Sequence, residues 1–251
     1  MKKYRIRLIQ QGPMTEIPNS LAVFGAICHG FKALYGKNKL ESFLERIDKA
    51  EEMFAVSSVF LGDTLPFPLD IEPPRVDLSA LDNEAFAKFK KIKKIKFISK
   101  SLFETYKNDL EKFNQSFYHH ILNGVYIFQE KHQLLCHQNE NSFFESIKII
   151  NHVATRNKWS LNDEEKSLFY TTRIVYSKDA PFDLYMFAED DRAVEIKKML
   201  EKLDYFTLGG KQSIGMNLFR YISMDEVKTF NSQSLLLISN ALVIPTHIDF
   251  D

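Results

Sequence analysis

The sequence reads Leu208-Gly209-Gly210-Lys211-Gln212-Ser213-Ile214-Gly215-Met216 between a predicted amphipathic helix and a predicted strand. Glycine permits positive φ and leaves backbone N–H groups uncovered, so such a loop can approach a phosphate backbone closely, with Lys211 adding charge. The pattern is neither a Walker loop nor a Rossmann fingerprint. The same glycines also suit an ordinary tight connection, so spacing alone leaves both interpretations open.

The segments around this loop predict a ferredoxin-like (RRM-like) α+β domain with an antiparallel sheet and both helices on one face. The evidence is an alternation of apolar residues in the expected strands and a 3.6-residue period in the expected helices. In chain order the elements are a strand at 4–10, a helix at 19–35, a hairpin of strands 169–176 and 182–188, a helix at 190–203 and a strand at 216–222. A further amphipathic helix is expected at about 39–50.

A large insertion is expected at about residues 66–160, because prolines at 66, 68, 73 and 74 exclude a central strand and the pattern beyond them is mixed. We therefore predict one domain over 1–230 that carries this insertion. The segment Leu235-Leu236-Leu237-Ile238 looks like the first strand of a further unit. Residues 231–251 are accordingly expected to begin an incomplete second half.

Composition narrows the class of protein. The chain has 251 residues, 45% of them apolar, and a net charge of zero, which removes the simplest argument for nucleic-acid binding, a strongly basic chain. Basic residues are nevertheless concentrated between Phe86 and Lys112, a segment that contains nine lysines and only three acidic residues. No apolar run is long enough to cross a membrane and no signal peptide is visible, so a cytosolic (cytoplasmic) protein is expected. Cys28 and Cys136 lack any partner spacing, which predicts packed thiols and neither a disulfide nor a metal site; no cofactor is expected.

The glycine segment, preceded by a helix and followed by a short aromatic strand, resembles the glycine-rich loop of the RAMP proteins of CRISPR systems. More narrowly, the chain resembles the fourth subunit of type III-A Csm complexes, a Cas-five-like group in which Leu-Gly-Gly-Lys-Arg-x-x-Gly-x-Gly is typical. Three further stretches agree in order and spacing: Ile17-Pro18-Asn19-Ser20-Leu21, Gly62-Asp63-Thr64-Leu65-Pro66-Phe67 and Thr171-Thr172-Arg173. The resemblance spans roughly residues 1 to 240. It departs from the family at Gln212, where an arginine is usual, and at Asn217, where a glycine is usual; Asn tolerates left-handed φ better than most residues.

The resemblance implies a non-catalytic RNA-binding subunit that caps the repeat-derived 5′ tag of crRNA in an antiviral interference complex. It also implies partners: crRNA, a large polymerase-like subunit of the Cas-ten type and a backbone RAMP subunit. Family members usually continue into a second ferredoxin-like half, so the chain is expected to be a short or C-terminally truncated member. The RNA-binding residues expected are Gly209, Gly210, Lys211, Gln212, Ser213, Gly215, Arg173, Lys90, Lys91, Lys93, Lys94 and Lys96.

Two other interpretations stay open. RAMP-fold endoribonucleases that process CRISPR repeats without a metal often use a histidine near the first helix, and His29 lies on the face of that helix away from its apolar side. Zero net charge also allows a purely structural partner that makes no RNA contact. The small residues Ala22, Ala26 and Ala33 beside His29 leave an unusually uncharged helix face, which is a candidate docking surface for a protein partner.

Overall fold

The computed structural model describes residues 2–68, 83–157, 168–177, 179–210 and 214–227. The chain divides into two compact units. Unit 1 holds the described residues up to Gly62 and those from Ile150 to Val227, and unit 2 holds Asp63–Ile149. The expected insertion at about 66–160 therefore corresponds to unit 2 and the strand that follows it, while the expected second half at 231–251 lies outside the described residues.

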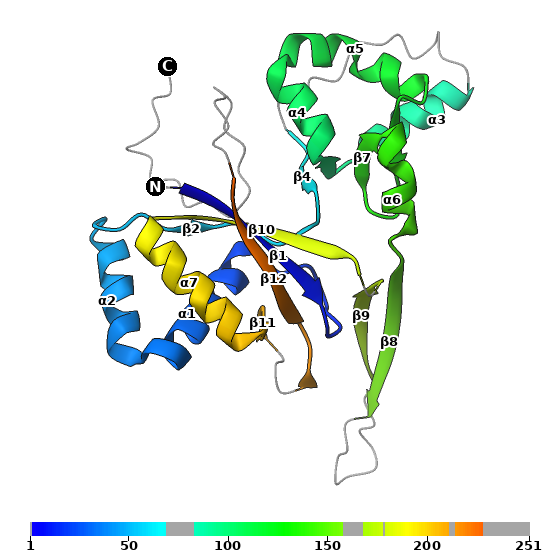
Figure 1. The fold of residues 1–251 in the computed structure, drawn as a ribbon. Coiled ribbons are helices and arrows are strands. Elements are labelled where there is room, and N and C mark those ends of the chain that lie inside the picture. The colour runs from blue at the N-terminus through cyan, green and yellow to red at the C-terminus, as the bar shows by residue number, and fades with distance from the viewer. Residues whose placement is uncertain (1, 69–82, 158–167, 178, 211–213, 228–251) are drawn as a thin grey trace. The chain divides into compact units, whose positions relative to one another are not determined.

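Unit 1 is built on an antiparallel sheet with the strand order β11-β12-β1-β10-β2, and β3 also pairs with β10 (Figure 1). Its strands are β1 (Lys2–Gln10), β2 (Ala55–Val56), β3 (Phe60–Leu61), β10 (Pro181–Ala188), β11 (Tyr205–Thr207) and β12 (Leu218–Val227). Its helices are α1 (Ser20–Tyr35), α2 (Lys37–Asp48) and α7 (Asp190–Leu203). This arrangement is the ferredoxin-like plan, with β1 between the third and fourth core strands.

Alternation along β1 decides which face of this sheet is buried. Ile6 lies opposite Leu184 of β10 on one side and opposite Met224 of β12 on the other, and all three side chains are buried. Arg5 and Arg7 point to the opposite face because successive side chains of a strand alternate. The sheet therefore has one apolar face and one face that carries charge.

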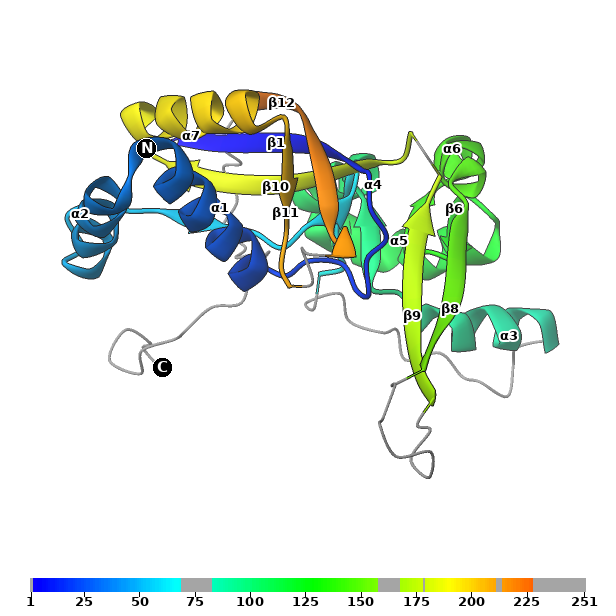
Figure 2. The ribbon, with the colours of Figure 1, turned by 90° about the horizontal axis from the view of Figure 1, so that it is seen from below.

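Helices α1 and α7 cover the apolar face (Figures 1 and 2). The Asn19 side chain accepts a hydrogen bond from the Ala22 N–H and caps α1, and Gly36 ends the helix with a φ of 88°. Gly30 lets α1 approach α7, because a Cβ added there would lie 2.8 Å from Met199 Sδ. The predicted helices at 19–35 and 190–203 are confirmed, and the one expected at about 39–50 is α2.

The predicted hairpin of 169–176 and 182–188 is wrong in its pairing. Both segments are strands, but β9 (Leu168–Tyr176) pairs with β8 (Ile149–Asn157) in a separate two-stranded sheet, whereas β10 pairs with β1, β2 and β3. The second core strand is the interrupted pair β2 and β3, which comes before unit 2 in the chain. Composition identifies a strand, but its partner depends on distant segments. The last strand also begins later than predicted, at Leu218, because Met216 and Asn217 belong to the loop.

Unit 2 is a four-stranded mixed sheet with helices. Its strand order is β4-β5-β7-β6, in which β5 and β7 run parallel and the other pairs are antiparallel. Its elements are β4 (Thr64–Pro66), α3 (Asn83–Ile92), β5 (Phe97–Ser99), α4 (Lys100–Asn108), α5 (Leu110–Leu122), β6 (Tyr126–Gln129), β7 (Leu134–His137), a 3₁₀ helix (Gln138–Glu140) and α6 (Asn141–Ser146). Phe113 and Phe117 of α5 are buried near Tyr126 of β6, and the Phe113 and Tyr126 rings stack with centroids 5.9 Å apart. The unit thus has an apolar core of its own.

Candidate nucleic-acid interface

The glycine-rich loop closes the hairpin of β11 and β12. Thr207 pairs with Leu218 at the end of the ladder, and the Leu208 N–H donates to the Asn217 carbonyl over 2.9 Å. Gly209 and Gly215 have φ values of 107° and 72°, a region that favours glycine. Two of the three loop glycines thus use the positive φ that glycine permits, and Gly210 does not. Lys211, Gln212 and Ser213 lie outside the described residues, so their expected role in RNA binding stays a prediction.

Asn217 takes over the role of the glycine usual at its position. Its φ is 56°, in the left-handed region that Asn tolerates. Its side-chain amide donates to the Gly210 carbonyl over 3.1 Å, and its backbone N–H donates to the Pro13 carbonyl over 2.8 Å. Asn217 therefore braces the loop from within and also ties it to the segment that follows β1.

Gly12 fits directly against this loop. A Cβ added at Gly12 would lie 2.2 Å from the Gly215 carbonyl oxygen, a separation that real Cβ atoms do not show. The Gly12 N–H also donates to the Leu218 carbonyl over 3.1 Å. Sequence reasoning missed Gly12 as part of the site, although the turn dipeptide Gly12-Pro13 was a signal that this segment bends.

The loop also lies beside the start of α1. A Cβ at Gly209 would be 3.7 Å from the Ala22 Cβ, which is ordinary van der Waals contact. Gly210 has open space around its Cα and is exposed. The backbone at Gly210 is therefore accessible to a ligand on the outside of the hairpin.

Arg173 lies near the same segment after β1. Its neighbour Ile174 bridges to Met14, and the Gln10 side chain donates to the carbonyls of Ile174 and Gly12, each over 2.9 Å. Arg173 is partly exposed, and its Nε is buried with no hydrogen-bond partner among the described residues. The structure thus brings Arg173 and the glycine-rich loop to the same short segment, residues 10–14.

The predicted lysines belong to unit 2, at the end of α3 and in the turn after it. Lys90 lies over the Phe86 ring, 4.5 Å from its centroid, and Lys91 pairs with Glu130 at 2.5 Å. Lys93, Lys94 and Lys96 are exposed and make no side-chain hydrogen bond or ion pair with the described residues. Lys94 is nevertheless near Glu130, whose pKa is lowered mainly by Lys91 and further by the charge of Lys94. The charges of Lys93 and Lys96 are available to an anion. The predicted RNA-binding residues are therefore divided between the two units. Those of unit 1, the glycine-rich loop and Arg173, lie around segment 10–14, whereas the lysines belong to unit 2.

The remaining residues singled out in the sequence are His29, the two cysteines and Trp159. His29 is exposed on α1, as predicted. Cys136 is buried, and burial raises the pKa of its thiol to about 12, while Cys28 is half-buried with a raised pKa from the same cause. Within the described ranges, no group of His, Cys, Asp and Glu is arranged to hold a metal ion, and no described helix is long and apolar enough to cross a membrane. Trp159 lies outside the described residues.

A ferredoxin-like sheet with a glycine-rich loop before its last strand defines the class. The sequence profile of the RAMP superfamily matches residues 11–219, and the chain belongs to this superfamily. It is similar to "CRISPR system Cms protein Csm4" of Thermococcus onnurineus (strain NA1), with 34% identity over 105 residues. That match covers 39% of this chain and 35% of the relative, so it spans about a third of the relative's length.

A solved structure with a TM-score above 0.5 agrees on the fold. A chain in the crystal structure of the Csm3–Csm4 subcomplex in the type III-A CRISPR–Cas interference complex superimposes with a TM-score of 0.55 at 17% identity, covering 91% of this chain and 70% of that one. A chain in the crystal structure of the Csm1–Csm4 cassette in complex with cA4 gives a TM-score of 0.49 at 18% identity, covering 89% of this chain and 71% of that one. The predicted ferredoxin-like RAMP fold and the resemblance to the Csm4 group are confirmed.

Proposed function

We propose that this chain is a non-catalytic subunit of a type III-A CRISPR (Csm) interference complex that binds and caps the repeat-derived 5′ tag of crRNA. The observation that carries the proposal is the construction of the glycine-rich loop. Left-handed residues at Gly209, Gly215 and Asn217 shape it, and Gly12 packs against it. Such a loop presents backbone N–H groups to phosphates without obstructing side chains.

Charge for the phosphates comes from three places in this proposal. Lys211 belongs to the loop sequence, Arg173 lies near segment 10–14, and the lysines of α3 and the following turn add cations in unit 2. Phosphate contacts of this kind supply affinity and make it depend on salt. Similarity to a Csm4 protein, together with the likeness in fold to a chain of the Csm3–Csm4 subcomplex from a type III-A complex, supports the type III-A assignment. The partners are then a large Cas-ten-type subunit and a backbone RAMP subunit, with the uncharged face of α1 as a candidate docking surface.

Filter binding of guide RNA with and without the repeat tag tests the proposal. We expect tighter retention of the tagged guide, and a loss of that preference in Lys211→Ala and in a combined Lys93→Ala, Lys94→Ala and Lys96→Ala variant. Lys198→Ala, which removes one exposed cation from α7, is the matched control and should behave as wild type. Equal affinity for both guides would refute tag capping. Unchanged retention in every lysine variant would favour the purely structural role.

A second candidate, a metal-independent repeat endoribonuclease, is motivated by the exposed His29 on α1. Incubation with repeat RNA in EDTA separates the two functions. The proposed role predicts intact RNA with both wild type and His29→Ala. Cleavage that disappears in His29→Ala would assign the enzyme instead.

A further inference from the structure

The arginines of unit 1 differ in whether they have acidic partners. Four of the six arginines with described side chains form ion pairs: Arg5 with Asp225, Arg7 with Asp183, Arg46 with Glu52, and Arg192 with Glu52 and Glu195. Arg173 and Arg220 form none within the described part of the chain, and the Nε of each is buried without a hydrogen-bond partner. Buried donors without a partner are rare in folded proteins, so each of the two calls for an explanation.

Arg220 stands at the base of the glycine-rich loop. It pairs across the hairpin with Tyr205 of β11 and across β12 with Ile9 of β1. Two strand positions separate the Tyr205–Arg220 pair from the Thr207–Leu218 pair where the loop begins, a distance of about 7 Å at the usual rise per residue. A ligand held by the loop is therefore close to this pair.

The Tyr205–Arg220 pair lies on the face of the sheet that α1 and α7 leave uncovered. Phe219, the neighbour of Arg220, is fully buried on the helix-covered face, and Ile9 alternates with Leu8, which is also fully buried. Directly opposed residues share a face, so Tyr205 and Arg220 project together to the other side. Tyr205 is 46% exposed and Arg220 is partly exposed, so both side chains are accessible from that side.

The acidic groups nearby do not neutralise Arg220. Asp225, further along β12, pairs with Arg5 at 3.7 Å. Asp183 is wholly buried beneath Arg7, which donates to both of its carboxylate oxygens over 2.8 and 3.0 Å. Asp204 precedes Tyr205 and is exposed, and its backbone carbonyl accepts from the Tyr221 N–H. The guanidinium of Arg220 thus stays available for an anion.

We propose that Arg220 and Tyr205 form an additional contact for single-stranded RNA beyond the glycine-rich loop, on the helix-free face of the sheet. The guanidinium fork of Arg220 holds a phosphate, and the Tyr205 ring stacks on a base. This inference rests on the proposed RNA-binding function. It adds two residues to the RNA-binding residues expected from the sequence. The bound RNA would then continue from the glycine-rich loop onto the helix-free face of the sheet.

The test is the salt dependence of RNA affinity, measured with the full chain and single-stranded guide RNA. Arg220→Gln should reduce the slope of log affinity against log salt by about one, as expected for one lost phosphate contact. Arg220→Lys should restore most of that slope. Tyr205→Ala should weaken binding about tenfold, since stacking is lost, while Tyr205→Phe should remain close to wild type.

Lys202→Gln is the matched control, because it removes one exposed cation from the last turn of α7. It should leave slope and affinity unchanged, and thermal melting should show all variants folded. An unchanged slope in Arg220→Gln together with weakened binding in Lys211→Ala would overturn this inference and leave the proposed function standing. Unchanged RNA binding combined with lost assembly would assign this face to a protein partner and also overturn it. A wild-type chain that retains no RNA would refute both.

Discussion

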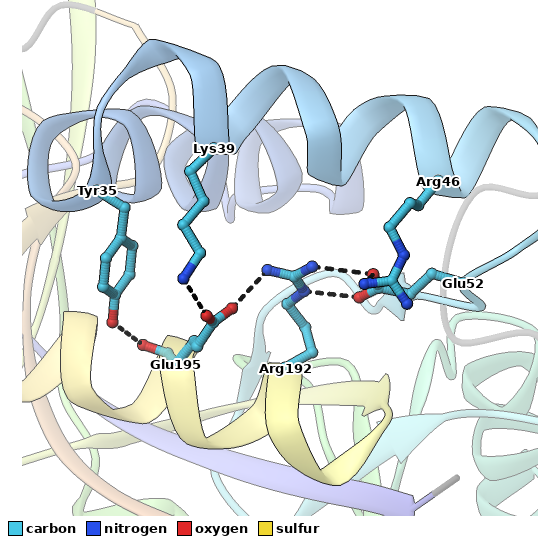
Figure 3. A network of polar contacts seen from close by, with 6 residues as sticks. All are labelled: Tyr35, Lys39, Arg46, Glu52, Arg192 and Glu195. Atoms are coloured by element: carbon cyan, nitrogen blue, oxygen red, sulfur yellow. Dashed lines mark hydrogen bonds and ion pairs between the residues drawn. The ribbon is translucent and has the colours of Figure 1, made fainter.

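The guanidinium of Arg192 and the carboxylate of Glu52 form a bidentate pair inside unit 1, with N–H···O distances of 2.6 and 2.9 Å (Figure 3). Only 7% of Arg192 and 3% of Glu52 are exposed. A third bond from Arg192, 2.6 Å long, reaches Glu195, and the Phe43 ring centroid lies 4.1 Å from the guanidinium carbon. The pair therefore joins α7 to the turn after α2 and to the aromatic core between them.

Removal of one partner should be costly. Arg192→Met leaves Glu52 buried with only the half-exposed Arg46 beside it, at 3.3 Å. We expect a loss of about 3 kcal/mol in the free energy of unfolding, as is typical when a buried ion pair is broken. Urea unfolding measures this change. The control Arg46→Met should cost less than about 1 kcal/mol, because its side chain is 45% exposed.

The double variant Arg192→Met with Glu52→Met separates pairing from packing. It removes both charges at once, so it should be more stable than Arg192→Met alone. A double variant that loses the sum of both single effects would show that the two side chains contribute independently.

The same pair predicts a dependence of stability on pH. Hydrogen bonds from Arg192 hold the pKa of Glu52 below its usual 4.5. Glu52 thus gives up its proton more readily in the folded than in the unfolded chain, so its contribution is fully present above pH 4.5 and is lost as pH falls through the folded-state pKa. Urea unfolding between pH 7 and pH 3 should show the gap between wild type and Glu52→Gln narrowing on the acid side. A gap that widens there would contradict the assigned direction.

Local signals in the sequence predicted the helices and the loop. Contacts between segments far apart in the chain could not be predicted in this way. The Asn19 cap and the apolar spacing of α1 lie within one segment, so its bounds were accessible, and the left-handed φ at Asn217 follows from a residue preference. The partner of β9 and the Arg192–Glu52 pair depend on segments far apart in the chain. No sequence period encodes such contacts. The requirement for glycine at position 12 was likewise not predictable, because it arises only when the glycine-rich loop packs against this residue and leaves no room for a Cβ.

Two glycines of α1 should respond in opposite ways to alanine. Gly30→Ala places a Cβ 2.8 Å from Met199 Sδ and 2.9 Å from a Leu203 methyl carbon, so the ends of these two side chains must shift between α1 and α7, and we expect a loss of about 1 kcal/mol. Gly25→Ala meets no atom within 4 Å and should gain about 0.5 to 1 kcal/mol, because alanine favours the helix. Thermal melting of both variants checks the pair. A destabilised Gly25→Ala would contradict the open space around that residue.

Asn217 offers the sharpest test of how the loop keeps its shape. Asn217→Gly retains the left-handed backbone but loses the bond to the Gly210 carbonyl. Asn217→Ala loses the same bond and keeps a Cβ at a left-handed φ that alanine tolerates less well than asparagine, which costs about 1 kcal/mol more than glycine. If loop shape decides RNA retention, Asn217→Gly should bind guide RNA more tightly than Asn217→Ala. Asn139→Ala, an exposed amide in unit 2, should match wild type. Equal binding by the Gly and Ala variants, with both weaker than wild type, would mean that the side-chain bond, and not the left-handed φ, is what holds the loop for its ligand.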